Sequence, residues 1–312
     1  MQIIRSDINL DFIGKRKIAA VFSAVLILAG LVSLLVQGGP NYGIDFAGGT
    51  LVQVKFSEAT DAGRIKAALD DLSLGSIVVQ RFGDDPNEFL VRVQEARGEG
   101  EQALSRQISA SLEKIYGKDQ VDLRRVEMVG PQVGKDLRQK GLLAIFYAML
   151  GILVYITWRF EFRFAVGAIV ALLHDVLITL GAFSISGREI DLPIIAAFLA
   201  IVGYSLNDTI IVYDRIRENV GKHQKSGFAT VINRSINETL SRTILTSGTT
   251  LLVVLALFIF GGGVIHNFAF ALLIGILVGT YSSIFVASPV LIFWQDFRQK
   301  RRASAATSGS AS

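Results

Sequence analysis

The chain has 312 residues, of which 51% are hydrophobic and only 19% are charged. Its mean hydropathy of +0.48 is too apolar for a soluble globular protein, in which about 25% of residues are usually charged. The composition therefore predicts an integral membrane protein. The chain has no cysteine, which excludes disulfides, thiolate metal sites and thiol redox chemistry in any compartment.

Six stretches are apolar and long enough to cross a bilayer as helices, which takes about 20 residues. The first follows Lys15 to Lys17, as the apolar part of a signal peptide would, but it is too long for one and predicts a membrane anchor. The six predicted spans are Ile18–Val36, Leu142–Trp158, Phe164–Ser184, Pro193–Tyr213, Thr243–Phe260 and Phe268–Phe293.

Basic residues fall in alternate loops between these spans. The net charge of +4 could by itself suggest nucleic-acid binding, but short cytoplasmic loops retain Lys and Arg, so the alternation predicts a topology with both termini in the cytoplasm. The two short outer loops contain only Arg188. The predicted cytoplasmic basic residues are Arg5, Lys15, Arg16, Lys17, Arg159, Arg163, Arg215, Arg217, Lys222, Lys225, Arg234, Arg298, Lys300, Arg301 and Arg302.

The chain divides into four predicted parts. Residues 1–37 form a cytoplasmic N-terminus and the first span, and residues 38–140 a domain on the outer face of the membrane. Residues 141–295 form a region of five spans. Residues 296–312 form a basic cytoplasmic tail, which we expect to be disordered because its end is small and polar without apolar periodicity.

The outer segment has mixed charges and apolar residues at alternate positions, as strands do. Helices are predicted over Asp61–Leu72 and Gly100–Tyr116, and a turn over Gly83–Asn87. The order β-α-β-β-α-β predicts a ferredoxin-like α+β domain. This order is shared by so many unrelated proteins that it identifies no ligand, and a spacer or docking module is its simplest role. The predicted strands are Leu51–Phe56, Ser76–Phe82, Glu88–Val93 and Val121–Val129.

The fourth span contains an acid, Asp208, together with Ser205, Asn207 and Thr209. It lies five residues, roughly 8 Å, from the predicted cytoplasmic end of the span. An ionised Asp near the centre of a membrane helix costs about 2.5 to 3.5 kcal/mol, so we expect Asp208 to face other helices. It is either a polar packing contact or a reversible protonation site.

Arg242 begins the fifth span at a similar depth and is the predicted partner of Asp208. Thr239, Arg242, Thr246 and Thr249 recur at helical spacing, which predicts a polar stripe that meets the polar face of the fourth span. The alternative is that Arg242 extends to the lipid headgroups and reports only the orientation of the helix.

The third span carries His174 and Asp175 near the middle of the bilayer. Adjacent helical residues point about 100° apart, so the two cannot share one target. Either each hydrogen-bonds a neighbouring helix, or they take part in a proton relay. No metal is expected at His174, because His223 and His266 fall on opposite sides of the membrane.

Two further patterns concern helix packing. Ser226–Leu240 has apolar residues at helical spacing, which predicts an amphipathic helix lying on the membrane surface. Gly275, Gly279 and Ser283 make a face of small residues in the sixth span, which favours close contact with another helix.

Four segments together resemble the SecF family, a branch of the resistance-nodulation-division transporter superfamily: Gly43–Thr50, His174–Val176, Gly203–Asn219 and Ile236–Thr243. The resemblance implies a protein of the bacterial inner membrane that pairs with SecD and associates with the SecYEG channel. It implies assistance to the movement of unfolded preprotein, driven by the proton-motive force. It also implies that Asp208 and Arg242 take part in proton passage, with the proton as coupling ion and no other cofactor.

Two other functions stay open from the sequence. The chain could be half of a small-molecule exporter of the same superfamily, which would need a far larger outer domain, or a non-transporting assembly scaffold, which would tolerate Asp208→Asn. No Gly-x-x-x-x-Gly-Lys-Ser/Thr motif is present, so ATP hydrolysis is not expected. No linear nucleophile–base motif indicates an enzyme either.

Overall fold

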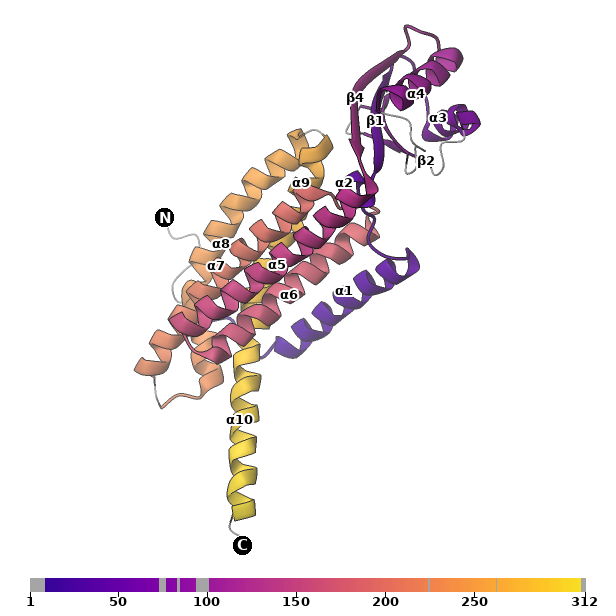
Figure 1. The fold of residues 1–312 in the computed structure, drawn as a ribbon. Helices are drawn as coiled ribbons and strands as arrows, with labels where there is room; N and C mark the ends of the chain where they lie inside the picture. The colour runs from indigo at the N-terminus through magenta and orange to yellow at the C-terminus, as the bar shows by residue number, and fades with distance from the viewer. Residues whose placement is uncertain are drawn as a thin grey trace.

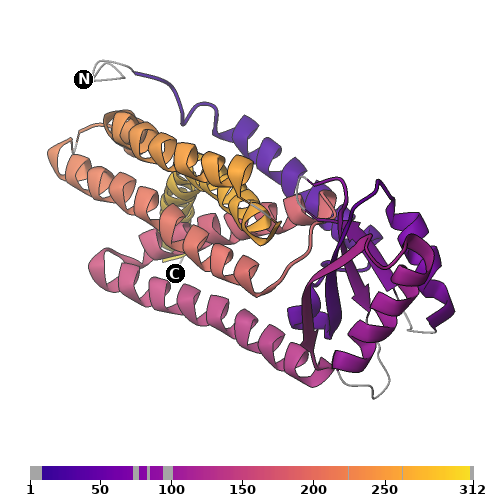
Figure 2. The ribbon, with the colours of Figure 1, turned by 90° about the horizontal axis from the view of Figure 1, so that it is seen from above.

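The computed structural model describes residues 9–72, 77–82, 85–93, 101–223, 225–261 and 263–309. It consists of a bundle of long helices with a small domain of strands and short helices at one end (Figure 1). In a second view, turned by 90°, the small domain again lies at that end of the bundle (Figure 2).

Six helices are long and apolar enough to cross a membrane, so the chain is a multi-pass membrane protein as predicted. The sixth runs over Ile265–Arg301 and is continuous through a π-helical turn at Ser283–Ala287. The helices are α1 (Arg16–Val36), α5 (Pro131–Arg159), α6 (Phe162–Ile185), α7 (Leu192–Lys222), α8 (Phe228–Phe260), α9 (Gly263–Ser282) and α10 (Ser288–Gly309).

Several helices extend beyond their apolar stretches. Helix α5 begins at Pro131 and so crosses the predicted domain boundary at residue 140, and α7 ends at Lys222 instead of Tyr213. Ion pairs one turn apart, such as Lys222 with Glu218, support the polar end of α7. As a result Asp208 lies near the middle of its helix, further from the end than predicted.

The prediction of a separate amphipathic helix on the membrane surface is wrong. Ser226–Leu240 belongs largely to α8, which runs from Phe228 to Phe260 without a break. Its apolar residues Ile232, Ile236 and Leu240 are buried in the core of the bundle. An amphipathic pattern suits packing against protein as well as against lipid, and nothing in the segment stops the helix.

The C-terminal tail also differs from the prediction of disorder, because α10 continues to Gly309. The residues beyond the membrane span include Gln, Lys, Arg and Ala, which favour helix. The tail therefore prolongs the sixth span as a helix that leaves the bundle (Figure 1).

The small domain is a four-stranded antiparallel sheet with two helices on one face, which confirms the ferredoxin-like prediction. The strands β1 (Gly49–Phe56), β2 (Ile77–Arg81), β3 (Glu88–Val93) and β4 (Val121–Val129) lie in the order β2-β3-β1-β4. Helices α3 (Ala62–Leu69), extended by a 3-10 turn at Asp70–Leu72, and α4 (Glu101–Tyr116) pack on one face. Parts of two predicted elements, residues 76 and 83–84, lie outside the described residues, as does Gly100.

The core of this domain explains why the sequence folds in this way. Alternate strand residues point to the helices, and the helices contribute apolar residues one turn apart. The buried set is Val52, Val54, Phe56, Ile65, Leu69, Phe89, Val91, Val93, Leu104, Ile108 and Leu112.

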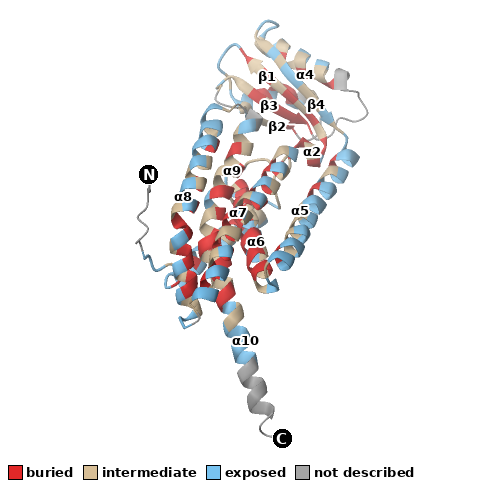
Figure 3. Ribbon diagram, turned by 90° about the vertical axis from the view of Figure 1, so that its left-hand side faces the viewer, coloured by how far each residue is buried: buried red, intermediate tan, exposed pale blue. Residues whose placement is uncertain are grey.

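Helices α6, α7 and α9 form the centre of the bundle. In the most apolar 18-residue stretch of α6, 61% is buried, whereas in that of α5 only 11% is buried, so α5 lies on the outside. Figure 3 shows the same division, with buried residues gathered on α6 and α7 and exposed residues along α5 and the upper part of α8.

Close contact between α9 and α7 depends on the predicted small residues. A Cβ atom added at Gly279 would lie 2.9 Å from the Cβ atom of Ser205, and one at Gly275 would lie 2.3 Å from Ile201. These glycines allow the two helices to approach closely, as the small-residue pattern predicts.

We expect Gly279→Val to lower the unfolding free energy of the detergent-solubilised protein by about 1 to 3 kcal/mol, because the added methyl groups overpack the contact with Ser205. Gly151→Val on α5 is the matched control, since a Cβ atom there meets nothing within 4 Å. Thermal unfolding of both variants measures the difference. Equal shifts would contradict the proposed role of the contact.

Candidate functional site

The first buried polar cluster surrounds Asp175 in the middle of the bundle. The Asp175 carboxylate contacts His174 Nδ1 at 2.9 Å and accepts hydrogen bonds from Ser205 at 2.6 Å and Ser282 at 2.8 Å. His174 Nε2 in turn lies 2.9 Å from the hydroxyl of Ser23 on α1. This Asp175 cluster therefore joins α1, α6, α7 and the sixth span.

The geometry confirms that His174 and Asp175 each hydrogen-bond neighbouring helices. They also contact each other, which the estimate of 100° between them did not predict. Ser23 and Ser282 were not predicted as site residues, because a hydroxyl within an apolar span is their only signal in the sequence. Tyr281 completes the link to α1, with its hydroxyl 3.0 Å from that of Ser23 and donating to the carbonyl of Ala19.

The second cluster surrounds Asp208 on α7. The side chain is 1% exposed, and its Oδ2 atom accepts a hydrogen bond of 3.1 Å from Ser247. Ser247 accepts in turn from Thr280 at 2.8 Å. The other carboxylate oxygen, Oδ1, is buried without a hydrogen-bond partner among the described residues.

The predicted polar stripe of α8 does not meet Asp208. Ser247 fills that place, while Thr246 and Thr249 hydrogen-bond carbonyls of their own helix. Thr239 is buried, but it also bonds its own helix. The rotation of α8 about its axis is fixed by packing along its whole length, and the spacing of polar residues cannot reveal it.

Arg242 is exposed and forms no ion pair with Asp208 in the part of the chain that the structure describes. It is near enough for its charge to act on the carboxylate through space. It also lines a cleft of about 700 Å³ where the C-terminal half of α7 meets the N-terminal half of α8, with Asp214, Arg215 and Glu238. Arg242 thus lies between a buried acid and a polar cleft.

The remaining predicted residues of α7 divide by exposure. Thr209 is buried and donates to the carbonyl of Ser205 at 3.1 Å. Asn207 and Gly203 are exposed on the outside of the bundle, and Asn207 lies next to Asp208 in the sequence. An exposed amide among apolar spans needs a polar neighbour, because lipid offers none.

The two buried acids differ in how well their oxygens are satisfied. Asp175 has three hydrogen-bond partners, whereas Asp208 has one and an oxygen with none in the described chain. A buried oxygen without a hydrogen-bond partner is unfavourable in an apolar bundle. Asp208 is therefore the acid whose hydrogen bonds the described residues leave incomplete.

The small domain is fixed to the membrane helices at a junction that the sequence did not predict. Arg92 on β3 forms a buried ion pair with Glu189 in the loop between α6 and α7, and donates to the carbonyl of Tyr42 at 3.4 Å. The loop also pairs with the segment after α1, since Gly43 N donates to the carbonyl of Ile190 at 2.8 Å. Glu189 thus connects the sheet to the loop that leads into α7.

The segment Gly43–Thr50 forms the other half of the junction, with α2 (Ile44–Ala47) at its centre. Gly48 has a φ of +76°, and a Cβ atom there would lie 2.8 Å from Cα of Pro131, so glycine is required for contact with the start of α5. Asp45 accepts a hydrogen bond of 2.9 Å from the backbone N–H of Leu192, the first residue of α7.

Two acids therefore lie at the N-terminus of the helix that carries Asp208. Asp191 caps α7 by accepting from the N–H of Ile194 at 3.3 Å, and Asp45 lies beside it. Burial raises the pKa of Asp191 to about 6 from its ordinary value of 3.8, and the charge of Asp45 acts in the same direction. The charge of Arg92 and the N–H of Ile194 act against this rise.

The folded protein binds the Asp191 proton more tightly than the unfolded chain does. Ionisation of Asp191 therefore lowers the unfolding free energy, and this loss is complete above about pH 6. We expect Asp191→Asn, which keeps the helix cap, to raise the unfolding free energy by about 1 kcal/mol at pH 8. The gain should vanish near pH 4. Thermal unfolding at the two pH values measures it, with exposed Asp122→Asn as a control of small effect. A gain of the same size at both pH values would contradict the assignment.

The sequence matches the family model "Protein export membrane protein SecD/SecF, C-terminal" over residues 107–297. It also matches the "SecD/SecF GG Motif" over residues 32–60, which includes the junction segment Gly43–Thr50. The chain belongs to this protein-export family. The match favours polypeptide export over the export of small molecules.

Curated relatives support the same assignment over the full length. A protein translocase subunit SecF from Magnetococcus marinus is 51% identical, with 98% of each chain covered. The subunit of that name from Vibrio alginolyticus is 47% identical, over 93% of this chain and 91% of the relative. These relatives are named as translocase subunits, a transport role and not an enzymatic one.

A solved structure shares the fold. The crystal structure of SecDF from Thermus thermophilus, described as a translocon-associated membrane protein, is 35% identical and superposes with a TM-score of 0.83 over 94% of this chain. A second SecDF crystal structure gives a TM-score of 0.69 at 36% identity. This chain covers 40% of the first and 41% of the second, so it spans less than half the length of either solved chain.

Proposed function

We propose that the chain is one half of a proton-driven accessory transporter of protein export, which SecD completes and which acts beside the SecYEG channel. The proton is the coupling ion, and unfolded preprotein is the substrate. The chain lies in the bacterial inner membrane with both termini in the cytoplasm and the small domain outside, as the alternation of basic loops indicates.

One observation carries this proposal: the buried Asp208 has an oxygen with no hydrogen-bond partner in the described chain. A proton on the carboxylate would remove its buried charge, and a donor from outside this chain would satisfy the oxygen as an acceptor. A carboxylate whose protonation changes in response to its surroundings is what coupling to a proton gradient requires.

The exposed polar residues near Asp208 support a second subunit. Asn207, Arg242 and Thr249 are exposed on α7 and α8, two of the helices long and apolar enough to cross a membrane. Polar side chains that face lipid are unfavourable, so this surface fits a polar helix surface of another membrane protein. The solved SecDF chains are more than twice the length that this chain covers, which supports SecD as that partner.

In the proposed cycle, Asp208 changes its protonation at the contact of α7 and α8, and Arg242 tunes that change through its charge. Repacking then moves α7, whose N-terminus is attached to the small domain through Asp45 and Glu189. The small domain transmits this movement to the polypeptide outside the membrane.

The test is reconstitution of the chain with SecD and SecYEG in vesicles, with and without an imposed proton gradient. We expect the gradient to stimulate export, and we expect the stimulation to require Asp208. Copurification of the tagged chain with SecD and the channel subunits tests the assembly separately. Export that is equally fast with and without the gradient would contradict the coupling.

A further inference from the structure

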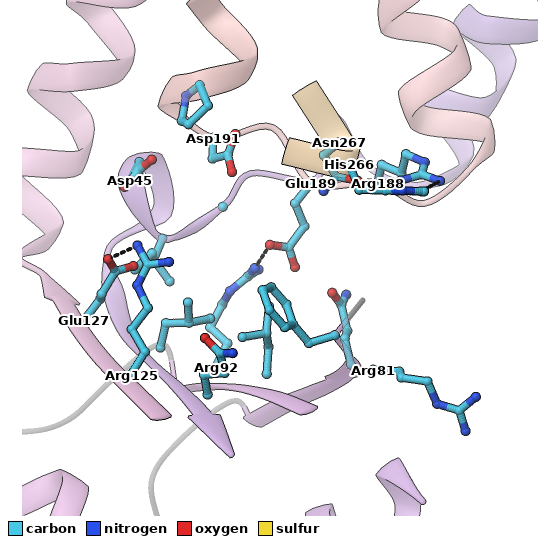
Figure 4. A pocket seen from close by; sticks show the side chains of 18 of the residues that line it. Asp45, Arg81, Arg92, Arg125, Glu127, Arg188, Glu189, Asp191, His266 and Asn267 are labelled. Carbon is cyan, nitrogen blue, oxygen red and sulfur yellow. Dashed lines mark hydrogen bonds and ion pairs between the residues drawn. The ribbon is translucent and has the colours of Figure 1, made fainter. Parts of the chain in front are cut away.

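The sheet of the small domain has a second face that no helix of the described domain covers. Because side chains alternate along a strand, Leu51 and Gln53 on β1 point away from the helices that bury Val52 and Val54. The register places Leu90 of β3 and Arg125 of β4 beside Gln53 on the same face. This open face looks toward the outer ends of the membrane helices (Figure 4).

A cleft separates this open face from the loops of the membrane region, and we call it the junction cleft. Its volume is about 460 Å³, within the range of roughly 300 to 1,000 Å³ typical of ligand pockets. One wall is the sheet, with Leu51, Gln53, Gln80 and Leu90. The opposite wall is made by the loop Gly187–Asp191, by Pro193, and by His266 and Asn267.

The cleft contains a buried polar atom that has no partner among the described residues. The side chain of Arg92 is 6% exposed and its guanidinium lies at the centre of the cleft between the two walls (Figure 4). Two of its nitrogens are used, one by Glu189 and one by the carbonyl of Tyr42. Its Nε atom is buried with no hydrogen-bond partner among the described residues. The lining of the cleft therefore leaves one of its buried donors unpaired within the described chain.

The mixed charges on the two walls disfavour a ligand whose charges all have the same sign. Arginines at positions 81, 92, 125 and 188 line the cleft together with the acids Asp45, Glu127, Glu189 and Asp191. Such mixed charges do not create the single-signed field that nucleic acids or other polyanions need. Leucine side chains and primary amides lie between them, and each amide both donates and accepts a hydrogen bond.

We propose that the junction cleft binds an extended segment of the translocating polypeptide. The amides of Gln53 and Gln80 meet backbone N–H and C=O groups, which every polypeptide has, and the leucines contact apolar side chains of the segment. Charges of both signs accommodate acidic and basic residues alike, so binding depends little on sequence. The inference rests on the proposed export function and adds to it the place where this chain holds its substrate.

The absence of cysteine from the chain allows a direct test, because each introduced thiol is unique. Gln53→Cys and Gln80→Cys place thiols in the junction cleft, and exposed Lys66→Cys on α3 is the matched control on the covered side of the sheet. Each variant is reconstituted with SecD and SecYEG and loaded with an arrested secretory polypeptide that carries single cysteines at successive positions. Mild oxidation then traps contacts as disulfides.

We expect Gln53→Cys and Gln80→Cys to cross-link at least fivefold more than Lys66→Cys, at several substrate positions and with two unrelated substrates. Cross-linking no stronger than that of Lys66→Cys, or confined to one substrate position in one sequence, would overturn the inference. The same reactions with Asp208→Asn separate the two proposals. Trapping that persists while Asp208→Asn exports normally would refute the coupling and leave the cleft, whereas loss of export in Asp208→Asn without trapping would refute the cleft alone.

Discussion

Asp208→Asn is expected to assemble normally and to reduce the stimulation of export by a proton gradient at least tenfold. The amide has the size of the carboxyl group and its oxygen can still accept from Ser247, so the bundle should stay intact. It cannot bind and release a proton. One charge that crosses 100 mV supplies about 2.3 kcal/mol, which biases a coupled equilibrium about 50-fold, and this contribution disappears in the variant.

The matched control is Asp214→Asn, the same change on the same helix at an exposed acid paired with Arg159. An exposed ion pair contributes little, so this variant should export at a rate close to that of the parent protein. Both variants are measured as polypeptide export into vesicles with and without the gradient, after equal assembly with SecD has been verified. Full stimulation in Asp208→Asn would show that the proton is carried elsewhere.

The fold was largely predictable because it depends on patterns that repeat along the chain. Six apolar stretches were sufficient to identify six helices, and alternate apolar residues such as Val52 and Val54 were sufficient to identify strands. Helix ends were less predictable, because hydropathy reports where the bilayer begins, whereas a helix continues as long as its backbone and side chains favour it. Lys222 and Phe228 illustrate this at the ends of α7 and α8.

The site was only partly predictable. Asp208, Asp175 and His174 are conspicuous because ionisable groups are rare in apolar spans. Their partners Ser247 and Ser282 are not, because a hydroxyl in a membrane helix usually bonds to its own backbone, as Thr246 does. Which polar residues face the acid depends on the rotation of each helix, and that is decided by the packing of the entire bundle.

The charged pair of the junction gave no signal in the sequence, because Arg92 and Glu189 are ordinary residues of a strand and a loop. Their importance comes from burial and from their position between two parts of the molecule. Arg92 is 5% exposed. Glu189 lies in the short loop that precedes the helix that carries Asp208. Among the described residues, this pair is the one ion pair that joins the sheet directly to that loop.

We therefore expect Arg92→Ala to lower export without preventing the protonation of Asp208. Removing one partner of a buried ion pair leaves an unpaired charge and costs about 3 to 5 kcal/mol, so the contact between the sheet and the loop should open. The isolated domain has its own core and should stay folded. We expect export to fall at least tenfold, while protonation of Asp208, followed by the infrared band of its carboxyl group, still responds to the gradient.

Charge reversal gives the decisive comparison. Arg92→Glu and Glu189→Arg should each abolish coupled export, and the double variant should recover part of it, because the attraction is restored with the partners exchanged. The matched control is the pair Arg124 and Asp122 on β4, which does not line the cleft and is 51% and 61% exposed, so its reversal should change export less than twofold. Recovery in the double variant identifies the contact itself as the connection, since a general loss of stability at either residue would add in the double variant and would not be reversed by it.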